Sequence, residues 1–168
     1  MKFNTRILVE GALCAALAIV LSYIRIFRMP QGGSVTLENV PLLIFALRHG
    51  IKAGVGVGAL AGVLQMILNG YVVHPAQAFL DYPLAFGALG LAGALSSPQW
   101  RGIVVGTAAR LTCHVASGVI FFASYAPEGQ HPLLYSLGYN GSYMVVNMIL
   151  SLIVIFLIWK RLPRTGDR

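Results

Sequence analysis

The chain consists of long hydrophobic stretches separated by short polar segments. No Asp, Glu, Lys or Arg occurs in residues 11–24, 53–80, 82–100, 111–127 or 129–159. About 20 predominantly apolar residues are enough for a helix to cross the hydrocarbon core of a bilayer. These stretches therefore predict membrane-spanning helices rather than the core helices of a soluble domain.

The polar segments divide the sequence into six predicted spans. They lie at 29–38, 48–52, 69–75, 96–102 and 127–132. The second span is short for a full crossing, so it must extend into the preceding loop, tilt, or lie partly buried. The predicted fold is a single all-α integral membrane domain over residues 1–168, with six transmembrane helices at roughly 7–26, 37–47, 51–68, 76–95, 103–124 and 134–159.

An even number of spans places both termini on one side of the membrane, and the basic residues identify that side. With a cytoplasmic N-terminus, nine of the 12 Lys and Arg residues are cytoplasmic, Arg25 and Arg28 are outside, and Arg110 is within a span. Cytoplasmic loops are enriched in Lys and Arg, so both termini are predicted to be cytoplasmic. No small-residue cleavage site followed by a polar domain appears, so the first span is expected to be retained.

Composition agrees with a membrane protein. Apolar residues make up 57% of the chain and charged residues 10%, the mean hydropathy is +0.76, and a soluble domain is about one quarter charged. The net charge of +7 is explained by topology and by attraction to anionic lipid headgroups. Because this charge does not gather on one soluble face, we expect no nucleic-acid partner.

Small residues recur at helical spacing in three of the predicted spans. Helices approach closely in a membrane only where their side chains are small. Each stripe is therefore expected either to pack inside the bundle or to form a surface for another membrane protein. The stripes are Ala12 and Ala16 with Ala15 and Ala18 nearby, Gly50, Gly54, Gly58 and Gly62, and Gly102 with Gly106.

Polar side chains within the predicted spans are functional candidates, because the bilayer disfavours them. The main ones are Asp81, Arg110, His114 and Asn140. By the predicted topology they lie in or near the outer half of the membrane, which predicts one outward-facing polar pocket. The supporting residues are Gln65, Gln77, Tyr71, Tyr82, Tyr135 and Tyr139.

The spacing of these residues indicates what the pocket binds. Asp81 and Gln77 are four residues apart, as are Arg110 and His114, so each pair shares a helix face. A carboxylate among aromatic rings and hydrogen-bonding groups suits a flat ring that carries a positive charge. We expect Arg110 to pair with Asp81 or with a backbone carbonyl and to position the carboxylate.

Two other functions compete with that interpretation. One is a membrane binding subunit or carrier for another cationic small molecule or for a transition metal, because His74, His114 and Asp81 are plausible metal ligands, although they lack typical ligand spacing. A hydrolase would use Ser34 or Ser117 with His114, but the contexts GGSV and ASGV contain no nucleophile motif. The chain also has no GxxxxGK[ST] loop, so ATP hydrolysis by that route requires partner proteins.

Four blocks of sequence together resemble the thiamine-specific substrate-binding subunits of energy-coupling factor transporters. With the first span, the resemblance covers nearly the whole chain. The blocks are MPQGGSVTLENVPLLIFALRHGIKAG (29–54), HPAQAFLDYPLAFGALGLAG (74–93), RLTCHVASGVIFFASYAPEG (110–129) and YSLGYNGSYMV (135–145).

The resemblance implies a six-helix fold with an outward-facing pocket partly covered by loop 29–38. Members of the family capture thiamine and associate with a transmembrane coupling subunit and two ATPases, which drive release inward. It also implies a prokaryotic cell-membrane protein with no cofactor and no enzymatic activity of its own. The docking surface for the coupling subunit maps to Ala12 and Ala16.

The resemblance also assigns ligand-binding positions. Asp81 is expected to balance the charge of the thiazolium ring, while aromatic residues line the rings of the ligand. Some family members place tryptophans around the ligand, whereas this chain has Phe122 in the fifth span and Ala61 in the third. The expected ligand-binding residues are Asp81, Tyr82, His114, Tyr135, Asn140, Phe122, Arg110 and Tyr71.

Overall fold

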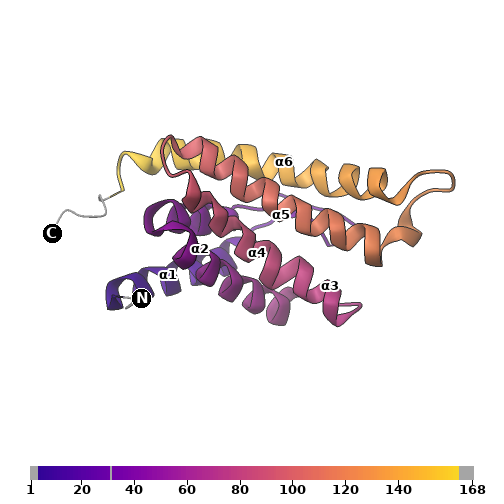
Figure 1. Ribbon diagram of the computed structural model, residues 1–168, viewed down its shortest axis with the longest axis horizontal. Helices are drawn as coiled ribbons and strands as arrows, with labels where there is room; N and C mark the ends of the chain where they lie inside the picture. The colour runs from indigo at the N-terminus through magenta and orange to yellow at the C-terminus, as the bar shows by residue number, and fades with distance from the viewer. Residues whose placement is uncertain (1–3, 31, 163–168) are drawn as a thin grey trace.

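Long helices run side by side along one axis of the molecule (Figure 1). The computed structural model describes residues 4–30 and 32–162. The α-helices are α1 (Thr5–Tyr23), α2 (Asn39–Asn69), α3 (Pro75–Phe79), α4 (Ala85–Ala88), α5 (Gln99–Phe121) and α6 (Pro132–Trp159). The remaining helical elements are the π-helix η1 (Leu80–Leu84) and the 3-10 helices η2 (Leu89–Ala94) and η3 (Ala123–Tyr125).

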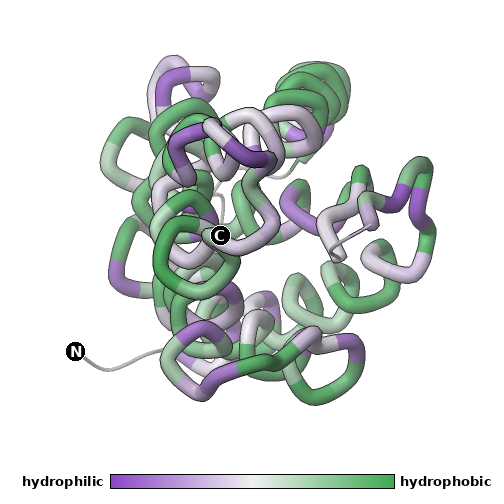
Figure 2. The backbone as a smooth tube through the Cα atoms, turned by 90° about the vertical axis from the view of Figure 1, so that its right-hand side faces the viewer, coloured by the Kyte–Doolittle hydropathy of each residue, from purple (hydrophilic) through white to green (hydrophobic). Residues whose placement is uncertain are grey.

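The predicted helical membrane architecture is confirmed in its coarse form. Within the described part of the chain, α1, α2, α5 and α6 are the four helices that are long and apolar enough to cross a membrane. Hydrophobic residues occur on all sides of the bundle (Figure 2). A helix that is apolar all round is one that lies in lipid or inside a larger core.

Helix α2 contains a break at Gly50, whose φ of 81° is outside the helical range. The predicted spans 37–47 and 51–68 therefore correspond to the two arms of one element. An arm over residues 39–49 rises only about 16 Å at 1.5 Å per residue. Leu43 and Ala46 of this arm are 0% exposed, so the short arm is enclosed by other helices rather than by lipid.

Residues 75–94 form one helical path built from α3, η1, α4 and η2. Pro83 lies inside η1. Proline has no amide hydrogen for the helix ladder, and the wider π turn accommodates it. Asp81 and Tyr82 consequently sit in the irregular turn of this segment.

Glycines allow this path to approach α2 closely. A Cβ atom at Gly58 would overlap the carbonyl oxygen of Phe86, and one at Gly62 would overlap that of Tyr82. A Cβ at Gly102 of α5 would likewise overlap the Ala92 carbonyl. The glycine stripes of the third and fifth predicted spans therefore pack inside the bundle, except at Gly50, where no atom lies within 4 Å of a Cβ position.

The alanines of α1 separate into two groups. Ala15 is 2% exposed and Ala18 is 1% exposed, and both belong to the main hydrophobic core. Ala12 and Ala16 are exposed on the outer side of the helix. Only the first pair packs internally, while the second pair remains on the surface.

A short antiparallel ribbon lies between α1 and α2, in a loop for which the sequence predicted no strands. It consists of β1 (Phe27–Arg28) and β2 (Ser34–Val35), with Phe27 opposite Val35. The Asn147 side chain of α6 accepts a hydrogen bond from the Thr36 amide and donates one to the Ser34 carbonyl, both at 3.0 Å. These two bonds attach the loop to α6.

Candidate ligand-binding site

A cavity of about 490 Å³ opens between the helices. It lies toward the end of the bundle where α3 begins, α5 ends and α6 begins, on the right in Figure 1. The β1–β2 loop contributes Gly33 and Ser34 to its lining. All eight ligand-binding residues expected from the sequence line this cavity: Tyr71, Asp81, Tyr82, Arg110, His114, Phe122, Tyr135 and Asn140.

Asp81 is held by hydrogen bonds from two helical segments. Its Oδ2 accepts from Gln77 Nε2 at 2.7 Å and from Ser117 Oγ at 2.7 Å, while His114 Nδ1 lies 2.9 Å from Oδ1. The Asp81 side chain remains 15% exposed. The Gln77 contact confirms the shared helix face that the sequence spacing predicted.

Arg110 does not pair with Asp81, and that expectation is wrong. Its Nη2 forms an ion pair with Glu38 Oε1 at 2.9 Å, its Nη1 donates to Asn39, and its guanidinium lies 3.8 Å from the centre of the Phe86 ring. Glu38 is the last residue of the loop before α2, and its side chain reaches Arg110 on α5. A carboxylate 72 residues away in the sequence is therefore the ionic partner of Arg110 in place of Asp81.

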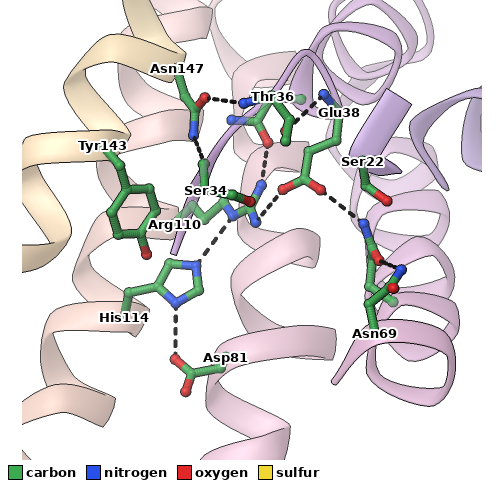
Figure 3. A network of polar contacts seen from close by, with 12 residues as sticks. Ser22, Ser34, Thr36, Glu38, Asn69, Asp81, Arg110, His114, Tyr143 and Asn147 are labelled. Atoms are coloured by element: carbon green, nitrogen blue, oxygen red, sulfur yellow. Dashed lines mark hydrogen bonds and ion pairs between the residues drawn. The ribbon is translucent and has the colours of Figure 1, made fainter. Parts of the chain in front are cut away.

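A chain of contacts runs from Asp81 through His114 and Arg110 to Glu38 (Figure 3). Arg110 Nε lies 3.3 Å from His114 Nε2. A guanidinium nitrogen only donates, so Nε2 must accept and the imidazole carries its proton on Nδ1. His114 is therefore neutral in this arrangement and donates to Asp81, whose charge no cationic side chain contacts directly among the described residues.

Glu38 extends the network to the far wall of the cavity. Its Oε2 accepts from Gln65 Nε2 at 2.8 Å, and Gln65 Oε1 accepts from Asn69 at 3.2 Å. In the sequence, Glu38 stands out only as the end of the loop 29–38. The available signal was its rarity, because the chain has five acidic residues and this one directly precedes a hydrophobic span.

Aromatic rings form two walls of the cavity. Tyr71 stacks on Phe122 at 6.2 Å between ring centres, and Tyr135 stacks on Tyr139 at 6.1 Å. Tyr71 lies outside the helices, and a hydrogen bond with Tyr125 raises the pKa of its phenol. Tyr82 accepts a bond from the Tyr71 amide at 2.7 Å, which links the outer loop to η1.

Asn140 is held at the contact between α5 and α6. Its Nδ2 donates to the Ser136 carbonyl at 3.0 Å, and its Oδ1 accepts from the Tyr143 hydroxyl at 2.9 Å. Gly118 makes the close approach possible, because a Cβ there would overlap Ser136 Oγ. The two helices thus present Asn140 and Tyr143 to the cavity as one unit.

The residues of the alternative chemistries have other partners. Ser117 donates to Asp81 rather than to His114. His74 caps α3 by accepting from the Ala76 amide at 3.1 Å, and its ring stacks on Phe121. Across the described residues, no group of three or more His, Cys, Asp or Glu side chains is arranged to hold a metal ion.

Comparisons with known proteins agree across nearly the full length of the chain. The thiamine transporter ThiT of Bacillus subtilis (strain 168) is 36% identical, and the match covers 94% of this chain and 92% of that protein. The ThiT of Lacticaseibacillus paracasei is 30% identical, covering 89% of this chain and 84% of that protein.

Solved structures give the same result for the fold. The structure of ThiT from Listeria monocytogenes matches with a TM-score of 0.85 at 30% identity, over 94% of this chain and 96% of that one. A structure described as the S component of a bacterial ECF transporter matches with a TM-score of 0.66 over 94% of this chain and 95% of that one. At 19% identity, this second match supports the fold alone.

The family model described as "Thiamine transporter protein (Thia_YuaJ)" matches residues 8–166. This match includes every residue that lines the cavity, and it agrees with the family that the four sequence blocks predicted. The chain therefore belongs to the thiamine transporter family.

Proposed function

We propose that this chain is the thiamine-binding subunit of an energy-coupling factor transporter, which captures thiamine with high affinity outside the cell and delivers it inward. Its family is one of transporters, so the chain acts in transport and is not an enzyme. It is a multi-pass protein of the cell membrane. Binding requires no cofactor in this proposal.

The observation that carries the proposal is the position of Asp81. Its carboxylate lies in an aromatic-lined cavity and is hydrogen-bonded by neutral side chains rather than paired with a cation. Thiamine contains a permanently cationic thiazolium ring joined to an aminopyrimidine. A carboxylate balances such a charge, and aromatic faces attract a flat cation.

In this proposal the expected ligand-binding residues act in different ways. Asp81 balances the ligand charge, and the neutral His114 lines the rings beside it. Tyr71, stacked on Phe122, provides an aromatic wall near the outer loop. The other proposed ligand contacts are Tyr82, Tyr135 and Asn140, while Arg110 acts through His114.

The proposed topology has six spans with the cavity opening outward and both termini in the cytoplasm. The spans are α1, the two arms of α2, the segment 75–94, α5 and α6. Figure 1 supports it, since α1 begins and α6 ends at the end of the bundle opposite the cavity. The Gly50 break lies at that end too, because the adjacent His49 contacts Glu10 of α1 at 2.7 Å.

Transport requires partners that this chain does not contain. We propose a transmembrane coupling subunit and two ATPase subunits, with lipid around the remaining surface and no nucleic-acid partner. The exposed Ala12 and Ala16 are the proposed docking positions on α1. Small exposed residues permit another helix to approach closely.

Direct binding tests the function. The purified protein in detergent is titrated with thiamine by calorimetry, and protein purified from thiamine-containing medium is analysed by mass spectrometry. We expect one thiamine per chain in both measurements. A different organic cation in the cavity would replace thiamine as the ligand, and a bound metal without an organic ligand would contradict the proposal.

A further inference from the structure

We infer that Glu38 is a specificity-determining residue that makes the cavity selective for a cationic ligand by neutralising Arg110. The inference rests on the proposed function, because it concerns the ligand charge that the same cavity prefers. Glu38 is not among the positions that the family resemblance assigned to ligand binding. Its role follows from the contacts and charges around the cavity.

Glu38 and Arg110 form a mostly buried ion pair. Their charged atoms are 2.9 Å apart, and the side chains are 11% and 7% exposed, respectively. Water screens such charges weakly, so removing one partner leaves the other with its full electrostatic effect on the site. Glu38 therefore determines whether Arg110 contributes a net positive charge to the cavity.

The ionisable groups deep in the cavity carry one negative charge in total. Glu38 and Arg110 cancel each other. His114 is neutral, since its Nε2 accepts from Arg110 Nε. The Asp81 carboxylate is left as the uncompensated charge, and a ligand with a single positive charge neutralises it.

Among the residues that the structure describes, the other charged ones that line the cavity are Arg25 and Arg28, and both are exposed. Water and salt screen exposed charges strongly. Their effect on a ligand beside Asp81 is therefore smaller than that of Arg110. Arg110 is separated from Asp81 by a single side chain, His114, which bonds to both (Figure 3).

The network also explains why Glu38 stays in position. Gln65 donates to its second oxygen at 2.8 Å, and Gln65 is in turn bonded to Asn69. Both carboxylate oxygens of Glu38 thus have partners on different helices. A change from Glu38 to Gln preserves the size and shape of the side chain and removes its charge, and it leaves one acceptor oxygen in place of two.

The test compares two ligands on each variant. The first is thiamine, and the second is its neutral isostere in which carbon replaces the positively charged thiazolium nitrogen. For Glu38→Gln we expect thiamine affinity to fall on the order of tenfold or more, because Arg110 then repels the cation. Affinity for the neutral isostere should fall less than about threefold, since repulsion acts only on charge.

Two variants serve as controls. Glu128→Gln removes the same formal charge from an exposed loop residue outside the cavity lining, and both affinities should stay within about twofold. The double variant Glu38→Gln/Arg110→Met removes both charges of the pair. Both absolute affinities should fall, because His114 loses its Arg110 partner, but the ratio of thiamine to isostere affinity should stay within about threefold of the wild-type ratio.

An equal loss of affinity for both ligands in Glu38→Gln would show a structural role and overturn the inference, as would no loss at all. If Glu38→Gln does not fold, the double variant decides, because it leaves no buried charge unpaired. A folded double variant without the preference for thiamine contradicts the inference. Failure of the wild-type protein to bind thiamine is a separate result, which overturns the proposed function as well.

Discussion

The half of the bundle near Gly50 and the half that contains the cavity place different kinds of residue on the contact faces of α2 and α5. Toward the Gly50 end, α2 and α5 present glycines such as Gly58 and Gly102 to residues 75–94. Toward the cavity, the same faces present Gln65 on α2 and Arg110 on α5, both buried. A single helix face thus changes from small residues to polar ones along its length.

This change determines which part of the bundle is closely packed and which part contains the cavity. Glycines bring backbones into contact and leave no room for a ligand. Long polar side chains hold the helices apart, and each must be hydrogen-bonded because an unpaired polar group is costly in the membrane. The cavity is formed where long polar side chains replace glycines between the helices.

The largest effect should come from breaking the close-packed half. In Gly58→Leu the new side chain has to enter the space of the Phe86 carbonyl, and we expect a loss of about 3 kcal/mol of stability from overpacking. Thermal unfolding in detergent measures it. Gly56→Leu is the matched control, because nothing lies within 4 Å of a Cβ at that position; equal destabilisation of both variants would refute the packing argument.

Removing the central charge of the polar half should have the next largest effect. Asp81→Asn keeps the shape of the side chain and removes the proposed partner of the thiazolium. We expect thiamine affinity to fall about 100-fold, or ~2.7 kcal/mol, with the folded state retained. Calorimetry with purified protein checks this, and an unchanged affinity would contradict the assigned role of Asp81.

A moderate effect is expected at the loop over the cavity. Asn147→Ala removes both hydrogen bonds that attach Ser34 and Thr36 to α6. At about 1 kcal/mol each, their combined loss should speed thiamine dissociation by up to roughly 30-fold, as measured by stopped-flow fluorescence. Ser142→Ala, on an exposed residue of the same helix, should leave the rate unchanged; equal rates in the two variants would show that the loop attachment has no effect on the ligand.

The smallest effect on the purified protein should occur at Ala12. Because this residue is exposed, Ala12→Trp should change stability by less than about 0.5 kcal/mol and leave thiamine binding intact, while thiamine uptake by cells falls. Ala15→Trp, three residues further along α1 at a position that is 2% exposed, should instead destabilise the fold. Normal uptake with Ala12→Trp would contradict the proposed docking surface.

Much of the candidate site was predictable from residue type and spacing. Asp81 and His114 are polar residues in hydrophobic stretches. Because placing such residues in lipid costs free energy, they stand out as functional candidates. The helical repeat placed Gln77 on the same face as Asp81, and the structure contains that hydrogen bond. These inferences needed only local geometry and the bilayer.

Contacts between distant segments were not predictable in this way. The ion pair of Arg110 joins α5 to Glu38, and no periodicity links two positions so far apart. The Gly50 break and the irregular turn at Pro83 have visible sequence signals in glycine and proline. Their consequence, a short buried arm and a carboxylate in a π turn, depends on which helices surround them.

The membrane environment, the coarse helical architecture and the polar residues available to a ligand could all be predicted from the amino-acid sequence, because the length of a hydrophobic stretch and the free-energy cost of a polar residue in lipid are local properties. Which charges meet depends on the packing of the helices. The tertiary structure places Glu38 beside Arg110 and leaves Asp81 bonded to neutral groups, since pairing depends on distances that only the packed helices define. The net charge of the cavity is therefore a property of the fold.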